Sequence, residues 1–110
     1  MKANIIFTTV PDKSTGEIIA NHLVRQQLAA CVNILPKMHS IYQMHSIYQW
    51  DGEVHNESEY LLIIKTLKPI NKKTFKGIKQ LHPYEVPEIV SIDISDGDID
   101  YLKWIENSVQ

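Results

Sequence analysis

The chain has 110 residues, of which 44% are apolar and 22% are charged, and its formal net charge is −2. This length and composition are typical of one globular domain covering residues 1–110, and they exclude a disordered chain. The small negative charge gives no reason to expect binding to nucleic acid or to an acidic membrane, and no apolar run approaches the roughly 20 residues that a membrane span needs.

The first predicted unit is a strand followed by a helix. Residues 3–10 are rich in β-branched side chains and end at Pro11, which indicates a buried strand. Ser14 and Glu17 have the spacing of a capping box, so we expect the helix to begin there. Apolar residues then recur at helical spacing and predict one buried face: Ile19, Leu23, Val24 and Leu28.

The second predicted unit is a hairpin. Residues 31–35 form an apolar strand that Pro36 interrupts, and residues 53–66 form the returning strand. Asp51-Gly52 lies between two alternating stretches, which is typical of a two-residue type I′ turn. The returning strand is polar near this turn and apolar at residues 61–64, so we expect the base of the hairpin in the core and the tip outside it.

The last predicted elements are a helix, a strand and a short helix. Lys68-Pro69 opens the helix and His82-Pro83 ends it. Its apolar side chains share one face, and its lysines favour a solvated opposite face over a nucleic-acid surface: Ile70, Phe75, Ile78 and Leu81 inward, Lys72, Lys73, Lys76 and Lys79 outward. Residues 89–94 predict the fourth strand, and Asp98 can cap the final helix.

The order β-α-β-β-α-β with a terminal helix predicts an α+β, ferredoxin-like sandwich with an extended hairpin. Two helices would cover one face of a four-stranded antiparallel sheet. Because residues 61–64 are apolar on both sides of their strand, the other sheet face needs a cover, and the sequence predicts self-association.

Five segments carry a family resemblance: LAACVNILP, SIYQWDGEV, EYLLIIKT, HPYEVPEIV and DYLKWI. In this order and spacing they resemble the CutA family of divalent-cation tolerance proteins. The resemblance implies a homotrimer similar in architecture to the PII signal proteins, with the hairpin reaching a neighbouring subunit. It implies no known reaction, so the leading hypothesis is a cytoplasmic protein, not an enzyme, that contributes to metal tolerance.

The resemblance also implies a candidate metal ligand. A copper site described in the family resembles a cysteine in the first strand plus a His-His pair before Pro-Tyr, and those positions here are Thr8, Leu81 and His82. Only His82 is an effective ligand, with the carboxylates of Glu85 and Glu88 near it in sequence. We therefore expect weak or intersubunit binding of copper or another divalent cation. Alternatively, the His82 ring donates to a carbonyl at the helix end.

Two further functions stay open. A PII-like sensor of small ligands, or a signalling trimer with an unidentified partner, would have a pocket between subunits lined by Lys65, His82, Tyr84 and Glu88. A hydrolase would use Glu85 or Glu88 as its acid or base. No glycine-rich phosphate loop is visible, which disfavours a nucleotide bound in the P-loop manner.

Cys31 and the start of the chain bear on the compartment. The lone Cys31 cannot form a disulfide within the chain, and we expect it to be a buried structural thiol. The first ten residues lack the long apolar core of a signal peptide. Both features favour a reducing cytoplasm.

The hexapeptide MHSIYQ occurs twice in tandem over residues 38–49. His39 and His45 lie six residues apart, a distance of roughly 20 Å along a strand, so they cannot share one metal ion in that conformation. Sliding the core strands by six residues would cost several buried side chains their partners, and that loss exceeds the free energy of giving up a favourable turn. We therefore predict that Leu35 stays near Leu62 and that the surplus residues appear at the tip, over residues 42–52.

Overall fold

The computed structural model describes residues 2–45 and 52–109. Its elements are, in chain order, β1 (Ala3–Val10), α1 (Lys13–Arg25), β2 (Cys31–His45), β3 (Gly52–Leu67), the 3-10 turn η1 (Lys68–Ile70), α2 (Asn71–Leu81), β4 (Ile89–Asp93) and α3 (Ile99–Ser108). The predicted order of elements is confirmed.

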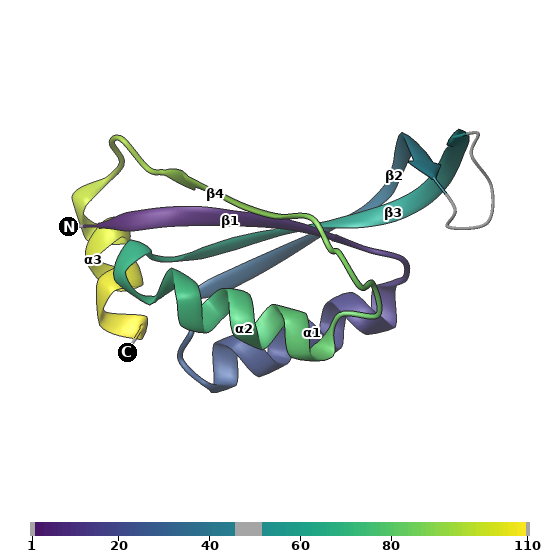
Figure 1. Cartoon of the computed structure of the whole chain (residues 1–110). Helices are drawn as coiled ribbons and strands as arrows, with labels where there is room; N and C mark the ends of the chain where they lie inside the picture. The colour runs from purple at the N-terminus through teal and green to yellow at the C-terminus, as the bar shows by residue number, and fades with distance from the viewer. Residues whose placement is uncertain (1, 46–51, 110) are drawn as a thin grey trace.

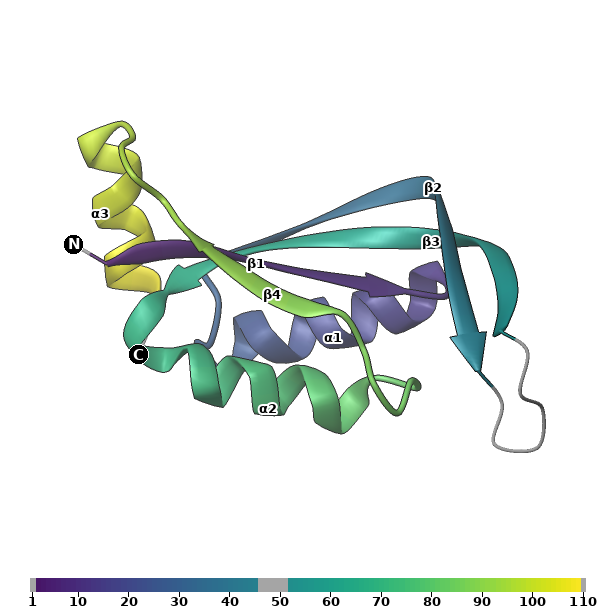
Figure 2. The ribbon, with the colours of Figure 1, turned by 45° about the horizontal axis from the view of Figure 1, so that its top comes forward.

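The strands form one antiparallel sheet in the order β2-β3-β1-β4. Helices α1 and α2 lie side by side across one face of this sheet (Figure 1). Helix α3 lies at the end of the sheet where β1 begins, and the distal parts of β2 and β3 project beyond the other end (Figures 1 and 2). The fold is the predicted ferredoxin-like sandwich with a long hairpin and a C-terminal helix.

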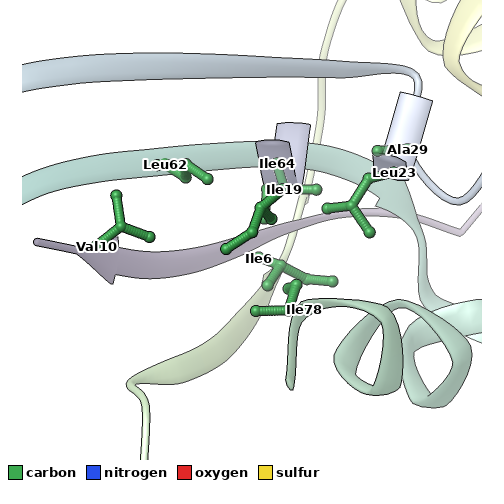
Figure 3. Close-up of a cluster of buried hydrophobic side chains, with 8 residues drawn as sticks. All are labelled: Ile6, Val10, Ile19, Leu23, Ala29, Leu62, Ile64 and Ile78. Carbon is green, nitrogen blue, oxygen red and sulfur yellow. The ribbon is translucent and has the colours of Figure 1, made fainter. Parts of the chain in front are cut away.

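The hydrophobic core fills the space between the sheet and the two helices. Side chains from β1, β3, α1, α2 and the connection between α1 and β2 meet there and are fully or almost fully buried (Figure 3): Ile6, Val10, Ile19, Leu23, Ala29, Leu62, Ile64 and Ile78. Alternate residues of β3 reach this core, as the period of a strand requires. Two predictions of buried residues are wrong, because Val24 of α1 is 44% exposed and Leu81, the last residue of α2, is 37% exposed.

Helix α1 begins two residues earlier than the capping box predicted. The carboxylate of Asp12 accepts hydrogen bonds from the Thr15 backbone N–H at 2.8 Å and from the Ser14 hydroxyl at 2.9 Å. These bonds, the Thr15 backbone bond foremost, hold the pKa of Asp12 below its ordinary value. Aspartate is as good an N-cap as serine, so the sequence offers two caps two residues apart, and the capping-box prediction chose the wrong one.

Helix α1 ends in a Schellman motif. The Leu28 N–H donates to the Leu23 carbonyl, and the Gln27 N–H donates to the Val24 carbonyl. Gln27 has φ = 58°, in the left-handed region where this motif usually places glycine. A side chain with a Cβ is strained in this conformation.

We expect Gln27→Gly to stabilise the protein by about 0.5–1 kcal/mol, because glycine removes the strain at positive φ at a smaller cost in chain entropy. Urea unfolding measures the change. Gln26→Gly is the matched control, since Gln26 has φ = −85° and gains nothing from glycine. Equal effects of the two substitutions would contradict this explanation.

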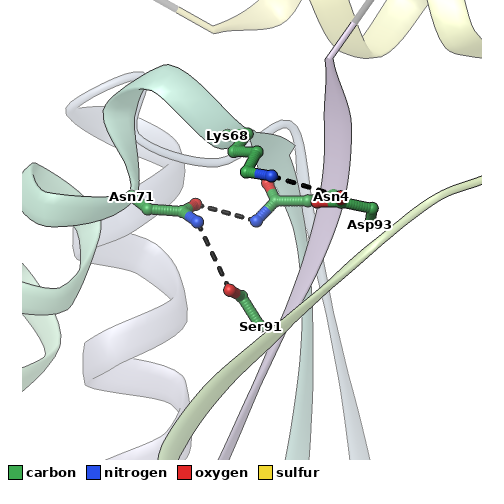
Figure 4. A network of polar contacts seen from close by, with 5 residues as sticks. All are labelled: Asn4, Lys68, Asn71, Ser91 and Asp93. Carbon is green, nitrogen blue, oxygen red and sulfur yellow. Dashed lines mark hydrogen bonds and ion pairs between the residues drawn. The ribbon is translucent and has the colours of Figure 1, made fainter.

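A polar network fastens the start of α2 to the sheet (Figure 4). The buried Asn4 amide of β1 donates to the Asn71 side chain at 2.8 Å, and Asn71 donates to the Ser91 hydroxyl of β4 at 3.4 Å. At the surface, Lys68 and Asp93 form an ion pair at 3.2 Å. Among residues 2–45 and 52–109, the buried side-chain oxygen of Asn4 has no hydrogen-bond partner, so it is an unsatisfied acceptor at this end of the core.

The register of the hairpin confirms the prediction for the core strands. Ile34 pairs with Leu62 and Leu35 with Leu61, one residue from the predicted partner. A bulge at residues 36–37 then shifts the register, and Met38 pairs with Glu59. Ile41 faces Asn56, so the core did not slide to accommodate the repeat.

The predicted Asp51-Gly52 turn is wrong, because Gly52 belongs to β3 and pairs with His45. Strand β2 continues to His45, which is three residues further than the start of the irregular tip that we predicted at residue 42. Residues 46–51, where the rest of that prediction falls, lie outside the described residues. His39 and His45 both lie in β2, six positions apart.

Candidate functional site

The segment between α2 and β4, residues 82–88, carries the HPYEVPE sequence and is tied to two strands. Its first residue bonds to β1 and its third bonds to β3. The segment therefore has a fixed position at the hairpin end of the sheet, although it contains no regular secondary structure.

Both ring nitrogens of His82 are engaged. The Tyr84 backbone N–H donates to Nδ1 at 3.1 Å, so Nε2 carries the proton and donates to the Thr9 carbonyl at 2.7 Å. Thr9 lies one residue beyond Thr8, the last residue of β1 that pairs with β4. The ring is 8% exposed and secures a carbonyl of β1 rather than a carbonyl of the helix. A metal ion could reach either nitrogen only after one of these hydrogen bonds breaks.

Tyr84 holds a buried carboxylate in place. Its hydroxyl donates to Glu59 Oε2 at 3.2 Å, and Glu59 is only 5% exposed. Burial, followed by the charge of Glu59 and this hydrogen bond, raises the pKa of Tyr84 to about 12. The neighbouring Tyr42 has a raised pKa for the same reasons, with Glu57 as its hydrogen-bond partner.

The raised pKa of Tyr84 predicts a loss of stability in alkali. The folded protein favours the protonated phenol, so its contribution is complete below the ordinary pKa of 10.0 and is lost as the pH rises through the folded value of about 12. Between these two pH values, the difference in unfolding free energy between wild type and Tyr84→Phe should shrink. Urea unfolding from pH 8 to pH 12 measures it, and a difference that does not vary with pH would contradict the assignment.

A hollow of about 1070 Å³ opens beside this segment, at the base of the projecting hairpin. Its lining comes from β1, β2, β3 and the segment itself: Thr9, Ser40, Ile41, Tyr42, Glu57, Glu59, Pro83, Tyr84, Glu85, Val86 and Glu88. Four of these described lining residues are glutamates, and none of them is a lysine or an arginine. The hollow is therefore suited to cations and repels anions.

The structure brings together some of the predicted site residues and separates others. Tyr84, Glu85 and Glu88 line the hollow, and His82 lies next to them. Lys65 lies six residues along β3 from Glu59, roughly 20 Å away, with its Nζ 5.7 Å from the Tyr101 ring. Within one chain, Lys65 is not part of this hollow.

Sequence reasoning missed Glu57 and Glu59. Both were assigned to the polar part of the hairpin near its turn, yet Glu59 is buried. The signal was available in the alternation of β3, because Glu59 has the same parity as Leu61 and Ile63 and so points to the same sheet face.

Cys31 and the other potential ligands do not converge. Cys31 lies opposite Lys65, is half-buried rather than buried as predicted, and its thiol contacts the Asn33 side-chain oxygen at 3.9 Å. Within residues 2–45 and 52–109, no three side chains of His, Cys, Asp or Glu are close enough to hold a metal ion. The four glutamates surround the hollow without meeting at one point.

The sheet face opposite α1 and α2 is apolar and largely uncovered in one chain. Neighbouring strands place Val90, Phe7 and Ile63 in one row across it, and Ile92 and Ile5 in the next. Val90 is 50% exposed and Ile92 is 52% exposed. We call this the uncovered sheet face: Ile5, Phe7, Leu35, Leu61, Ile63, Val90 and Ile92. The hollow opens at its hairpin end, where Thr9 and Glu59 continue the same face.

The profile of the CutA1 divalent ion tolerance protein family matches residues 4–108. The chain belongs to this family. It is 41% identical over 104 residues to the divalent-cation tolerance protein CutA of Thermus thermophilus, covering 94% of this chain and 95% of that protein. It is 38% identical over 106 residues to the chloroplastic protein CutA of Arabidopsis thaliana, covering 96% of this chain and 55% of that one. The chain thus spans about half the length of the plant relatives that it matches.

Solved CutA1 structures share the fold of this CutA1 family member. The crystal structure of CutA1 from Oryza sativa superposes with a TM-score of 0.89 at 36% identity, covering 98% of this chain and 94% of that one. CutA from Xylella fastidiosa gives a TM-score of 0.90 at 34% identity, covering 100% of both chains. Among the described helices, none is long and apolar enough to cross a membrane.

Proposed function

We propose that this chain contributes to divalent-cation tolerance as a homotrimer that binds copper or another divalent cation weakly, and that it is not an enzyme. The observation that carries the proposal is the hollow at the end of the uncovered sheet face, where the described lining includes four glutamates and no lysine or arginine. Carboxylate oxygens attract divalent cations, and the family to which the chain belongs is described as one of divalent ion tolerance.

The geometry around His82 supports weak rather than tight binding. Copper favours imidazole, and the His82 ring lies next to the hollow, against Tyr84. Its coordination would require the loss of the bond from the Tyr84 N–H or of the bond to the Thr9 carbonyl. That cost is subtracted from the binding energy, so we expect a Kd weaker than about 1 μM.

Self-association follows from the uncovered sheet face. Its side chains gain roughly 1.5–3 kcal/mol each when a second surface covers them. A trimer would also bring residues of a neighbouring subunit to the hollow, which could complete a cation site that one chain leaves open. The cytoplasm is the compartment that we propose, because the lone thiol of Cys31 has no partner cysteine in the sequence.

Calorimetric titration with Cu²⁺ tests the metal proposal. We expect His82→Ala to weaken copper binding several-fold and Cys31→Ser to leave it unchanged, since only His82 lies at the hollow. Thermal unfolding without metal checks that both variants are folded. Equal copper affinities of wild type and His82→Ala would show that His82 is not a ligand of the site.

A PII-like sensor of small ligands is the second candidate, because a hollow of this size exceeds what one ion needs. Tyr84 and Glu88 would contact the ligand, and Lys65 would have to come from a neighbouring subunit. Titration with a panel of nucleotides separates the two functions. The carboxylate lining predicts no heat from these anions, and clear nucleotide binding would favour the sensor.

Hydrolysis by Glu85 or Glu88 has less support. Both carboxylates are exposed, so neither lies in the apolar surroundings that usually keep a catalytic carboxylic acid protonated.

A further inference from the structure

The outer side of α2 carries a row of lysines. Four of the eleven residues of this helix are exposed lysines, and none of the eleven is acidic. We call them the basic stripe: Lys72, Lys73, Lys76 and Lys79. The other side of the helix holds the buried residues Thr74, Gly77 and Ile78. The lysines of the basic stripe therefore point their charges into solvent.

The charges of the chain are strongly segregated. Residues 60–84 contain six lysines and no Asp or Glu, which leaves five basic and thirteen acidic residues for the rest of the chain. Acidic groups border the basic stripe at both ends. Glu85 and Glu88 follow the end of α2, and Asp93 forms the 3.2 Å ion pair with Lys68 just before its start. The basic stripe is thus a positive region one helix long on a chain whose net charge is −2.

The arrangement of these lysines disfavours the folded helix. Lys72 and Lys73 lie in the first turn of α2, where the helix dipole is unfavourable to positive charge. Lys72 and Lys76 lie four residues apart, and like charges at this spacing repel each other on a helix surface. Among the described residues, no carboxylate pairs with a lysine of the basic stripe. A solvated surface needs charges, but mixed signs serve it without this repulsion, so solvation alone does not account for the basic stripe.

Helix α1 extends the face that carries the basic stripe. The two helices lie side by side (Figure 1), and a Cβ added at Gly77 of α2 would lie only 3.3 Å from Leu23 Cδ2 of α1. Glu17, the one carboxylate of α1, points away from α2, because it lies five residues from His22, which faces Gly77. The side of α1 opposite the buried Leu23 is exposed: Ile18, Asn21 and Arg25. The outer side of the two helices therefore adds Arg25 to the basic stripe and no carboxylate.

The length of the basic stripe limits what it can bind. Eleven helical residues span about 16 Å, which is the length of about five residues of an extended peptide. An acidic membrane or a nucleic-acid duplex is far longer than this. Either one would also meet the carboxylates at both ends of α2, and charges repel one another over a Debye length of about 8 Å. A short acidic segment of a polypeptide fits between these carboxylates.

We propose that the basic stripe, together with Arg25, is a docking surface for a short acidic segment of a partner protein. Carboxylates of the segment pair with the lysines and relieve the repulsion between Lys72 and Lys76. This surface lies on the helix side of the sheet, whereas the uncovered sheet face and the hollow lie on the other side. The docking surface therefore stays accessible when the uncovered sheet face is covered, and the inference does not depend on the proposed cation site.

Fluorescence anisotropy tests this docking with the full chain and a labelled peptide of six glutamates. We expect binding at about 50 mM salt and at least about fivefold weaker binding at about 200 mM, because salt screens exposed charges. The double variant Lys72→Gln/Lys76→Gln should bind the peptide at least about fivefold more weakly than wild type. Lys13→Gln/Lys103→Gln is the matched control, since it removes the same charge from two exposed lysines outside the basic stripe, and it should keep the wild-type affinity.

Three outcomes would overturn the proposal. Absence of peptide binding at the lower salt concentration is the first. Equal affinities of the two double variants are the second, because net charge rather than the basic stripe would then control binding. Vesicles of phosphatidylglycerol and a short DNA duplex are titrated under the same conditions, and tighter binding of either one than of the peptide is the third.

Lys72→Glu separates binding from a structural role of the lysines. A carboxylate in the first turn is favoured by the helix dipole, and it pairs with Lys76 four residues later. We therefore expect a higher urea midpoint of unfolding together with weaker peptide binding. A lower urea midpoint in Lys72→Glu would contradict the proposal, since the lysines would then stabilise the helix themselves.

Discussion

Ile63→Glu is expected to convert the proposed trimer of about 38 kDa, three times the 12.7 kDa of one chain, into monomers. Ile63 lies in the middle of the uncovered sheet face, between Phe7 of β1 and Asn33 of β2. A buried carboxylate without a partner costs several kcal/mol, which is as much as two or three apolar side chains contribute to an interface. Light scattering at micromolar concentration measures the mass.

Val24→Glu is the matched control for Ile63→Glu. Val24 is 44% exposed on the outer side of α1, and the same substitution there should leave the trimer intact. If Ile63→Glu leaves the mass unchanged, the uncovered sheet face is not the interface between subunits. If both variants dissociate, added negative charge rather than its position is the cause.

Leu62→Ala is expected to destabilise each subunit by about 2–5 kcal/mol, because Leu62 is fully buried between the sheet and α1. Val86→Ala, at a position that is 88% exposed, should change the unfolding free energy by less than about 0.5 kcal/mol. Urea unfolding of the three proteins measures both effects. A loss below about 1 kcal/mol in Leu62→Ala would contradict the described core.

A second substitution should partly restore Leu62→Ala. A Cβ added at Gly16 of α1 would lie 3.3 Å from Leu62 Cδ1 and 3.3 Å from Val10 Cγ2, so alanine is tight there in the wild type. With Leu62 shortened, the added methyl group fills part of the cavity and also favours the helix. The double variant Gly16→Ala/Leu62→Ala should therefore be more stable than Leu62→Ala alone, and simple additivity of the two single effects would contradict this contact.

Most of the fold could be predicted because the sequence carries it in local patterns. The eight residues of β1, the spacing of Ile19 and Leu23 in α1 and the Asp98 cap of α3 each depend on neighbours in the chain. The Asp12 cap was missed because two suitable caps, Asp12 and Ser14, lie only two residues apart and the backbone geometry selects one of them. The Asp51-Gly52 turn was missed for a different reason, since a long-range core register opposed a favourable local turn.

The site could be predicted only in part because its residues come from four places in the chain. The HPYEVPE segment was recognisable, and Tyr84 and Glu88 do line the hollow. The alternation of β3 indicates the sheet face of Glu59, but its contact with Tyr84 depends on how residues 82–88 fold against β3. The hydrogen bond from His82 to Thr9 was equally out of reach, since its acceptor is a β1 carbonyl 73 residues earlier in the chain.

Paramagnetic broadening of backbone amide signals by Mn²⁺ is the most direct test of cation binding at the hollow. Mn²⁺ prefers carboxylate oxygens, and at substoichiometric concentration it broadens only the signals near its binding site. The chain contains its own control, because Asp96, Asp98 and Asp100 form an exposed acidic stretch before and within α3. We expect broadening at residues 57–59 and 84–88 and none at residues 96–100. Broadening centred on residues 96–100, or spread evenly over the acidic residues, would contradict the proposed site.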